Sequence, residues 1–354
     1  MTRWGILKYM PTLTIPLVGL VSLTQGGGFS YFLLIYAFVL IPILELIIPP
    51  DPTNLSKEEE ELRRKDRGYD ILLYLMIPVQ YLFLYLFLTE MSRPEPTLFE
   101  RVGKTLAMGL GCGVLGINVA HELGHRHTWY EKLMSKLLLL TSLYMHFFIE
   151  HNRGHHRWVS TDRDPASARF GESVYAFWLR SMIFGYISAW RIENARVRKT
   201  GKWVFGPENE MVRFTLIQTA FVVFIFAYFG WMAGVCFLAA ALFGALLLET
   251  VNYIEHYGLS RKKLGENHYD KVMPVHSWNS DHVVGRIMLF ELTRHSDHHY
   301  HSGRKYQVLR HFDESPQLPT GYPGMMLLAL IPPLFFAVMN PRIERLRLQN
   351  PALA

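Results

Sequence analysis

Cysteine is nearly absent from this chain, whose 354 residues contain only Cys112 and Cys236. The two lie far apart, each within an apolar run, and no Cys-x-x-Cys pair is present. Two isolated thiols cannot build a thiolate metal site or an iron–sulfur cluster, and nothing in their spacing supports a disulfide. We therefore expect both to be small buried residues, and any redox chemistry to need other metal ligands and electrons from a separate protein.

Charged residues are also scarce, at 19% of the chain, whereas half of all residues are hydrophobic. The apolar residues gather in runs close to the roughly 20 residues that a helix needs to cross a bilayer. Six runs predict membrane spans, at approximately residues 6–23, 31–48, 71–88, 104–120, 211–229 and 231–251. Because the sequence has neither an internal repeat nor a low-complexity segment, we expect one all-α integral membrane domain over residues 1–354.

The charges between the runs predict the topology. Pro11 and Pro16 interrupt the first run and no small-residue cleavage site follows it, so we do not expect a secretory signal. Lys and Arg residues between positions 51 and 70 predict that this loop lies in the cytoplasm. Because successive spans cross the membrane in opposite directions, segments 121–210 and 252–354 are expected in the cytoplasm as well. Two further apolar segments are not expected to cross the membrane. We expect 132–149 to be an interfacial or re-entrant helix and 324–339 to be an interfacial helix.

Histidine, in contrast, is concentrated at the predicted cytoplasmic ends of helices. The run His295-Ser296-Asp297-His298-His299 has spacings that place its three imidazoles on one helix face. Alone, such a run also fits a solvated turn, but three other segments supply matching donors. Together the nine histidines are His121, His125, His151, His155, His156, His256, His295, His298 and His299. Because ionisable residues near membrane depth are costly and usually functional, this convergence indicates a metal site.

The number and spacing of these histidines limit what they can bind. Nine donors exceed the ligands of one ion and suffice for two ions with four or five imidazoles each, but imidazole alone does not select the metal. On a regular helix, His151 and His155 would share a face, with His156 about 100° further round. Nearby carboxylates could orient the rings, although each also fits a helix-end charge or an arginine partner. They are Glu122, Glu150, Asp164, Glu255 and Asp297. His146, His268 and His311 are expected to be structural.

Other functions explain fewer of these residues. Residues 121–125 match the H-E-x-x-H signature of zinc proteases, with Glu122 as general base, but that interpretation leaves six histidines without a role. Metal transport would spread polar donors through the depth of the membrane. The net charge of +6 favours anionic lipid or an acidic protein partner, and no basic stripe indicates nucleic acid.

The boxes H-x3-H, H-x3-H-H and H-x2-H-H, at residues 121–125, 151–156 and 295–299, resemble the membrane di-iron hydroxylases and desaturases. The box Asn252-Tyr253-Ile254-Glu255-His256-Tyr257-Gly258 narrows the resemblance to membrane-bound alkane 1-monooxygenases. The similarity runs from about the second predicted span to Asn340-Pro341-Arg342. Glu45 and Arg126 depart from the pattern, where aspartate and lysine are more usual.

This resemblance implies six transmembrane helices capped by a cytoplasmic di-iron site, with the nine histidines as iron ligands. It implies O2-dependent terminal hydroxylation of medium- to long-chain alkanes in a bacterial inner membrane, with electrons from a separate rubredoxin and its reductase. In relatives a bulky residue of the second span closes the inner end of the substrate channel. Counting back from Pro42 puts Ala37 there, which implies a deep channel. Hydroxylation of aromatic methyl groups or alkyl side chains, and acyl-chain desaturation, stay open because such enzymes share the boxes.

Overall fold

The structure, a computed structural model, describes residues 2–266 and 268–350, and most of them are helical. Within these residues, five helices are long and apolar enough to cross a membrane. They are Gly5–Thr24, Gly27–Ile47, Gly68–Ser92, Leu98–Gly124 and Glu210–His256. Gly230, with φ 85°, breaks the last of these into two arms, so each of the six predicted apolar runs lies on a long helix or on one arm.

Three of the first four membrane-type helices contain a stretch of 3-10 or π-helix, and the third is a regular α-helix. The first combines η1 (Thr2–Leu13) and α1 (Thr14–Thr24), and the third is α5 (Gly68–Ser92). The second is built from η2 (Gly27–Tyr31), α2 (Phe32–Ile35), the π-helix η3 (Tyr36–Leu40) and α3 (Ile41–Ile47). The fourth is built from α6 (Leu98–Gly111), the π-helix η4 (Cys112–Asn118) and α7 (Val119–Gly124).

The other elements are shorter, apart from α11 and α12. They are α4 (Lys57–Lys65), α8 (Trp129–Leu140), α9 (Phe147–Glu150), the π-helix η5 (His151–His155), α10 (His156–Trp158), α11 (Val174–Lys199), α12 (Glu210–His256), β1 (Lys263–Gly265), β2 (His268–Tyr269), η6 (Pro274–His276), α13 (Val283–Met288), α14 (His295–Tyr300), η7 (Tyr306–Val308), α15 (Tyr322–Ala329) and α16 (Pro332–Gln349). The strands β1 and β2 pair antiparallel.

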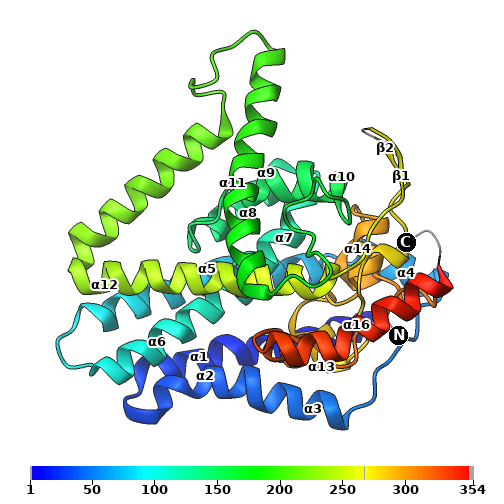
Figure 1. Cartoon of the computed structure of the whole chain (residues 1–354). Coiled ribbons are helices and arrows are strands. Elements are labelled where there is room, and N and C mark those ends of the chain that lie inside the picture. The colour runs from blue at the N-terminus through cyan, green and yellow to red at the C-terminus, as the bar shows by residue number, and fades with distance from the viewer. Residues whose placement is uncertain (1, 267, 351–354) are drawn as a thin grey trace.

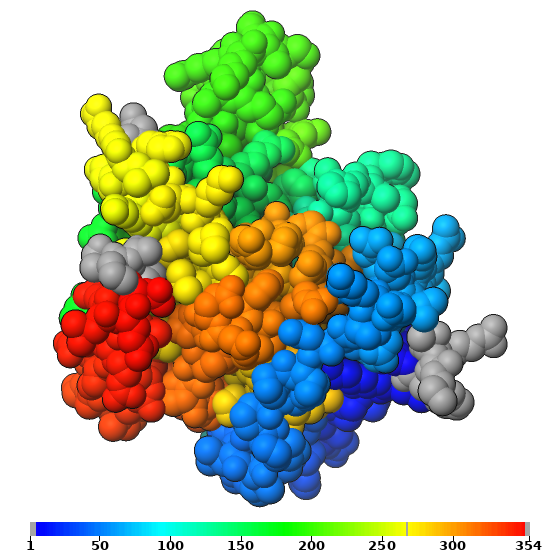
Figure 2. All heavy atoms as spheres, turned by 90° about the vertical axis from the view of Figure 1, so that its right-hand side faces the viewer, coloured from blue at the N-terminus to red at the C-terminus, as the bar shows by residue number. Residues whose placement is uncertain are grey.

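The long helices form a bundle that carries a cap at one end. In Figure 1, α1, α5, α6 and the second arm of α12 run in similar directions, whereas α11 runs across them. The helices α4, α13 and α14 gather at the right-hand end, where the described chain also begins and ends. Figure 2 looks onto this end, where the segment around α14, in orange, lies between N-terminal and C-terminal segments.

The apolar segment 132–149 does not cross the bundle. The Thr128 side chain caps the start of α8 by accepting a hydrogen bond from the Glu131 amide, as Thr and Ser do at helix starts. The helix ends at Leu140, the chain turns, and α9 leads back to the histidines of η5. The expectation of a segment that returns to the same side is confirmed, because His121 and His151 lie in one group.

The C-terminal apolar segment is broken rather than continuous. The helices α15 and α16 meet at 119°, and the break falls where Pro332-Pro333 begins the second helix. Proline cannot continue a helix from the preceding turn, so the single interfacial helix expected over 324–339 is wrong in this respect. Buried aromatic side chains fix the bend against the end of α12, among them Tyr253, Tyr322 and Phe335.

Candidate metal centre

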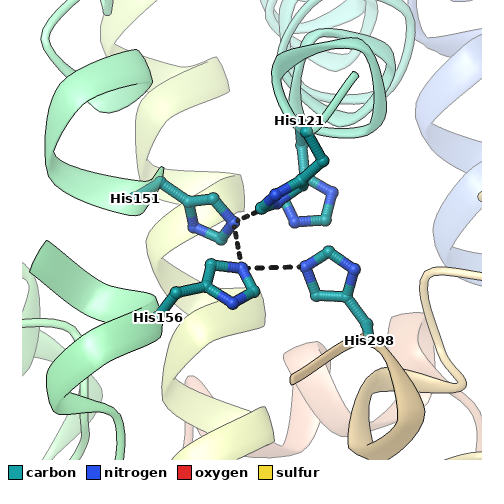
Figure 3. Close-up of side chains that lie close together, drawn as sticks. His121, His151, His156 and His298 are labelled. Carbon is teal, nitrogen blue, oxygen red and sulfur yellow. Dashed lines mark hydrogen bonds between the residues drawn. The ribbon is translucent and has the colours of Figure 1, made fainter. Parts of the chain in front are cut away.

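The nine predicted histidines come together at the cap end of the bundle in two groups. We call them cluster 1 (His121, His125, His151, His156 and His298) and cluster 2 (His155, His256, His295 and His299). Within each cluster, one ring nitrogen of every member lies within 4.8 Å of those of the others. Figure 3 shows four members of cluster 1 with their rings directed toward one another.

The distances between ring nitrogens test whether a metal ion fits. In cluster 1, His156 Nε2 lies 3.0 Å from His151 Nε2 and 3.1 Å from His298 Nε2. In cluster 2, His155 and His299 are 3.2 Å apart at Nε2, as are His256 and His295. Nitrogens about 2.1 Å from a common ion lie about 3.0 Å apart at an angle near 90° and about 3.4 Å apart in a tetrahedral site. The spacing of these closest pairs therefore fits a metal ion in either cluster, and it does not by itself select the ion.

The protonation state of the rings is also that of metal ligands. Burial, followed by the neighbouring imidazoles, lowers the pKa of His151, His156 and His298 well below the usual value. These rings are therefore neutral near pH 7, which is the form that binds metals. In addition, His121 Nε2 is buried and has no hydrogen-bond partner among the described residues. A buried polar atom without a partner is rare, and here a bound ion would satisfy it.

The assignment of His155 and His156 differs from the expectation. Residues 151–155 form the π-helix η5, whose wider turn brings a residue five positions on back to the same side. His156 therefore joins His151 in cluster 1, while His155 turns to cluster 2. The expected pairing of His151 with His155 on one face is wrong, because it assumed a regular α-helix.

Two of the five candidate carboxylates contact histidine rings of cluster 2. Asp164 Oδ2 lies 2.8 Å from His155 Nδ1, and Asp164 also accepts hydrogen bonds from Ser167 Oγ and the Ala166 amide. Glu255 Oε1 lies 3.2 Å from His295 Nδ1. Both contacts leave Nε2 of the ring directed into the cluster. Asp164 fixes the orientation of the His155 ring through a hydrogen bond, as metal-site partners commonly do, whereas Glu255 lies beside the His295 ring without hydrogen-bonding to it.

Two other candidates contact arginine instead of the cluster rings, which is the alternative that the sequence left open for them. Glu122 Oε1 lies 2.7 Å from Arg126 Nη2 and accepts a hydrogen bond from the Tyr306 amide. This contact also occupies the carboxylate that a zinc protease would need as general base. Glu122 follows His121 on the helix and points about 100° away from it, toward Arg126.

Asp297 likewise contacts groups other than the rings of the two clusters. It lies 3.0 Å from His301 Nδ1 and 2.7 Å from Arg304 Nη1, and it accepts a hydrogen bond from the Arg310 amide. The fifth candidate, Glu150, is buried, and its Oε1 has no partner among the described residues.

The remaining histidines named from the sequence lie outside both clusters. His146 is buried against Tyr144, with ring centroids 4.3 Å apart. His311 Nδ1 lies 2.6 Å from Asp281 Oδ2, and His268 belongs to β2. The sequence analysis missed Tyr322, whose hydroxyl donates to Glu255 Oε1 at 2.7 Å. No local sequence pattern indicates this contact, because Tyr322 lies 67 positions from Glu255.

An apolar cavity of about 100 Å³ leads from the clusters into the bundle. At one end it is lined by His121, His151 and His295. Its walls come from the second and fourth membrane-type helices, the second arm of α12 and α15, and Ala37 lines it. The cavity can therefore present an apolar molecule directly to the histidine clusters.

Comparisons with known proteins agree with this geometry. Residues 102–328 match the sequence profile of the fatty acid desaturase family. The chain is 42% identical to alkane 1-monooxygenase 1 of Pseudomonas aeruginosa, over 89% of this chain and 83% of that protein. It is 38% identical to alkane 1-monooxygenase 1 of Alcanivorax borkumensis, over 93% of this chain and 81% of that protein. A more distant relative, at 26% identity over 96% of this chain and 89% of its own length, is the xylene/toluene monooxygenase hydroxylase component XylM of Pseudomonas putida. Identity at the level of the first two, over so much of both sequences, shows that the chain belongs to the alkane 1-monooxygenase family.

Proposed function

We propose that this protein hydroxylates the terminal carbon of medium- to long-chain alkanes, with two irons held by the nine histidines. The observation that carries the proposal is the apolar cavity that ends on His121, His151 and His295. The reaction is R-CH3 + O2 + 2e⁻ + 2H⁺ → R-CH2OH + H2O. Cluster 1 would hold one iron and cluster 2 the other, and bound iron would supply the activation of O2 that no side chain provides.

The residues of the chain bind and orient the substrate. Phe147, Leu292 and Val251 belong to the cavity lining and exclude water around the reacting methyl group. A cavity between helices admits a linear chain only lengthwise, so the terminal carbon is the one presented to the clusters. Asp164 holds the ring of His155 through a hydrogen bond, and Glu255 lies beside the ring of His295. A site fixed in this way needs little rearrangement during turnover.

The electrons would come from a separate rubredoxin and its reductase, since both cysteines of the chain are free and buried. His125 and His156 are half-buried, whereas every member of cluster 2 is buried. Cluster 1 is therefore the side at which an electron carrier can approach. Lys132 lines the surface hollow next to His125 and favours an acidic carrier, whose rate of reaction should fall with added salt. This face would lie on the cytoplasmic side of a bacterial inner membrane.

Metal and product analysis test the proposal together. The purified protein should contain two irons per chain, and an alkane with 18O2 should give a labelled 1-alkanol. His256→Ala should lower the iron content and abolish turnover, because it removes a buried ligand of cluster 2. One zinc per chain, or a product without the label, would contradict the proposal.

A second candidate is supported by the more distant similarities. The relative XylM is named for xylene and toluene, and the matched profile is that of fatty acid desaturases. Oxidation of an aromatic methyl group or an alkyl side chain, or desaturation of an acyl chain, would use the same clusters. A labelled benzylic alcohol as the preferred product, or an unlabelled alkene, would favour these alternatives.

A further inference from the structure

A second apolar cavity adjoins the one that ends on the histidines. It measures about 440 Å³ and lies between the second membrane-type helix, the second arm of α12 and α15, and Leu106 of α6 also lines it. Several of its lining residues are exposed on the outer surface of the bundle, among them Ile35 (50%), Val39 (49%) and Leu330 (39%). We call it the outer groove, and the cavity at the histidines the inner cavity.

Among the described residues, none that lines the outer groove offers a free polar side-chain group to a ligand. Its side-chain donors and acceptors are Trp178 Nε1 and Thr250 Oγ1, which bond to each other at 3.0 Å. Thr250 Oγ1 also donates to the Leu246 carbonyl. The groove lies on helices that are apolar enough for a membrane, so its natural surroundings are hydrocarbon. An unbranched hydrocarbon chain from the bilayer core is therefore the occupant that its chemistry fits.

Only three side chains are common to the two cavities: Phe38, Leu247 and Met326. They come from η3, α12 and α15, and each is half-buried. A wall of three apolar side chains on three separate elements can open when side chains change rotamer, without separating the helices. Phe38 moreover belongs to a π-helix, a form that commonly occurs at functional sites.

We propose that Phe38, Leu247 and Met326 form a lateral gate through which a linear alkane passes from the membrane into the inner cavity. The inference rests on the proposed function, and it adds the route of the substrate and the three residues that control it. A gate facing the bilayer would let the enzyme draw on alkane dissolved in the membrane, where such a substrate is far more concentrated than in water.

The first test fills the wall with a larger side chain. Leu247→Trp should lower kcat/KM about tenfold, since it slows binding and leaves the reacting groups in place. The fall should be similar for every alkane of a graded series, because all chains pass the same wall. Leu242→Trp is the matched control, since Leu242 lies on the same helix, is 51% exposed and lines neither cavity. Equal kcat/KM in the two variants, with equal iron content, would overturn the gate.

A second measurement does not depend on turnover. Cys112 and Cys236 are buried, so an apolar maleimide should label chiefly a cysteine introduced by Met326→Cys. Dodecane should slow this labelling several-fold and leave that of the control Leu242→Cys unchanged. Absence of protection by dodecane would contradict the gate. Protection by phospholipid vesicles alone, with no further effect of dodecane, would assign the groove to a lipid chain and also contradict it.

These outcomes distinguish failure of the gate proposal from failure of the proposed function. If the wild-type protein forms no alcohol from any alkane, the proposed function fails, while protection by dodecane still reports hydrocarbon in the groove. If the wild type forms alcohol and Leu247→Trp equals its control, only the gate fails. Phe38→Ala gives a check that does not depend on the fold tolerating a larger residue. It should raise kcat/KM for branched alkanes relative to linear ones, and an unchanged ratio would count against the gate.

Discussion

At the scale of single residues, Asp164 is the carboxylate with the clearest contact to a proposed metal ligand. Its carboxylate lies 2.8 Å from His155 Nδ1, and both side chains are buried. Asp164→Asn should weaken metal binding by cluster 2 about 10- to 100-fold, because the ring loses the charge that orients it. Iron retained after dialysis against a chelator measures the effect. Asp313→Asn, at an exposed carboxylate, is the control, and equal iron retention in both variants would show that Asp164 does not support the site.

A second residue, Ala37, lines the inner cavity, and we propose that it sets the length of alkane that the cavity accepts. Its small side chain lines the cavity on the second membrane-type helix, so Ala37→Trp would place an indole ring in the path of the substrate. The longest alkane hydroxylated should become shorter, while short alkanes keep their rates. Ile43→Trp, on the same helix at an exposed position lining neither cavity, should leave the profile unchanged. Assays with a graded alkane series give both profiles, and identical ones would remove Ala37 from the channel.

At the scale of elements, the three π-helices of the described chain all lie at the site. The inner cavity is lined by Ala37 of η3, Asn118 of η4 and His151 of η5. Each π-turn holds one residue more than an α-turn, which rotates the residues that follow it. In η5 this rotation divides the neighbouring residues His155 and His156 between the two clusters.

Removal of the extra residue tests the role of η5. Deletion of Asn152 should convert the turn to a regular α-helix and rotate His151 by about 100° relative to His155 and His156. We expect loss of iron from cluster 1 and loss of turnover. Asn152→Ala is the matched control, since it removes only the side-chain hydrogen bond to the Phe148 carbonyl and keeps the length of the turn. Full iron content in the deletion variant would refute the importance of the π-turn.

These elements also mark how far the sequence could predict the site. Hydropathy sufficed to predict the six long apolar helical segments, and the spacing of the histidines sufficed to predict that the nine belong to one site. Both predictions depend on residues that are close together in the chain. The division into two clusters could not be predicted, since a π-turn has no reliable sequence signature. Likewise, the contact of Glu122 with the Tyr306 amide joins residues 184 positions apart, and no local pattern announces it.

At the scale of the whole molecule, the proposed orientation is accessible to labelling. Gly28 lies in η2 at the start of the second membrane-type helix and Lys57 at the start of α4, before the third, and both are exposed. A membrane-impermeant maleimide should label Gly28→Cys on intact cells but Lys57→Cys only after permeabilisation, because basic loops stay in the cytoplasm. The reverse pattern would place the histidine clusters on the outer side.

The division of neighbouring histidines has a consequence for how the enzyme matures. His155 and His156 serve different clusters, and so do His298 and His299, so the two ion sites share two short backbone segments. An ion bound in either cluster would hold both segments in place and thereby favour binding in the other cluster, which would be positive cooperativity. Native mass spectra taken during iron titration should show chains with no ion or with two, and few with one. Scarcity of iron would then reduce the number of complete enzyme molecules rather than fill every molecule by half.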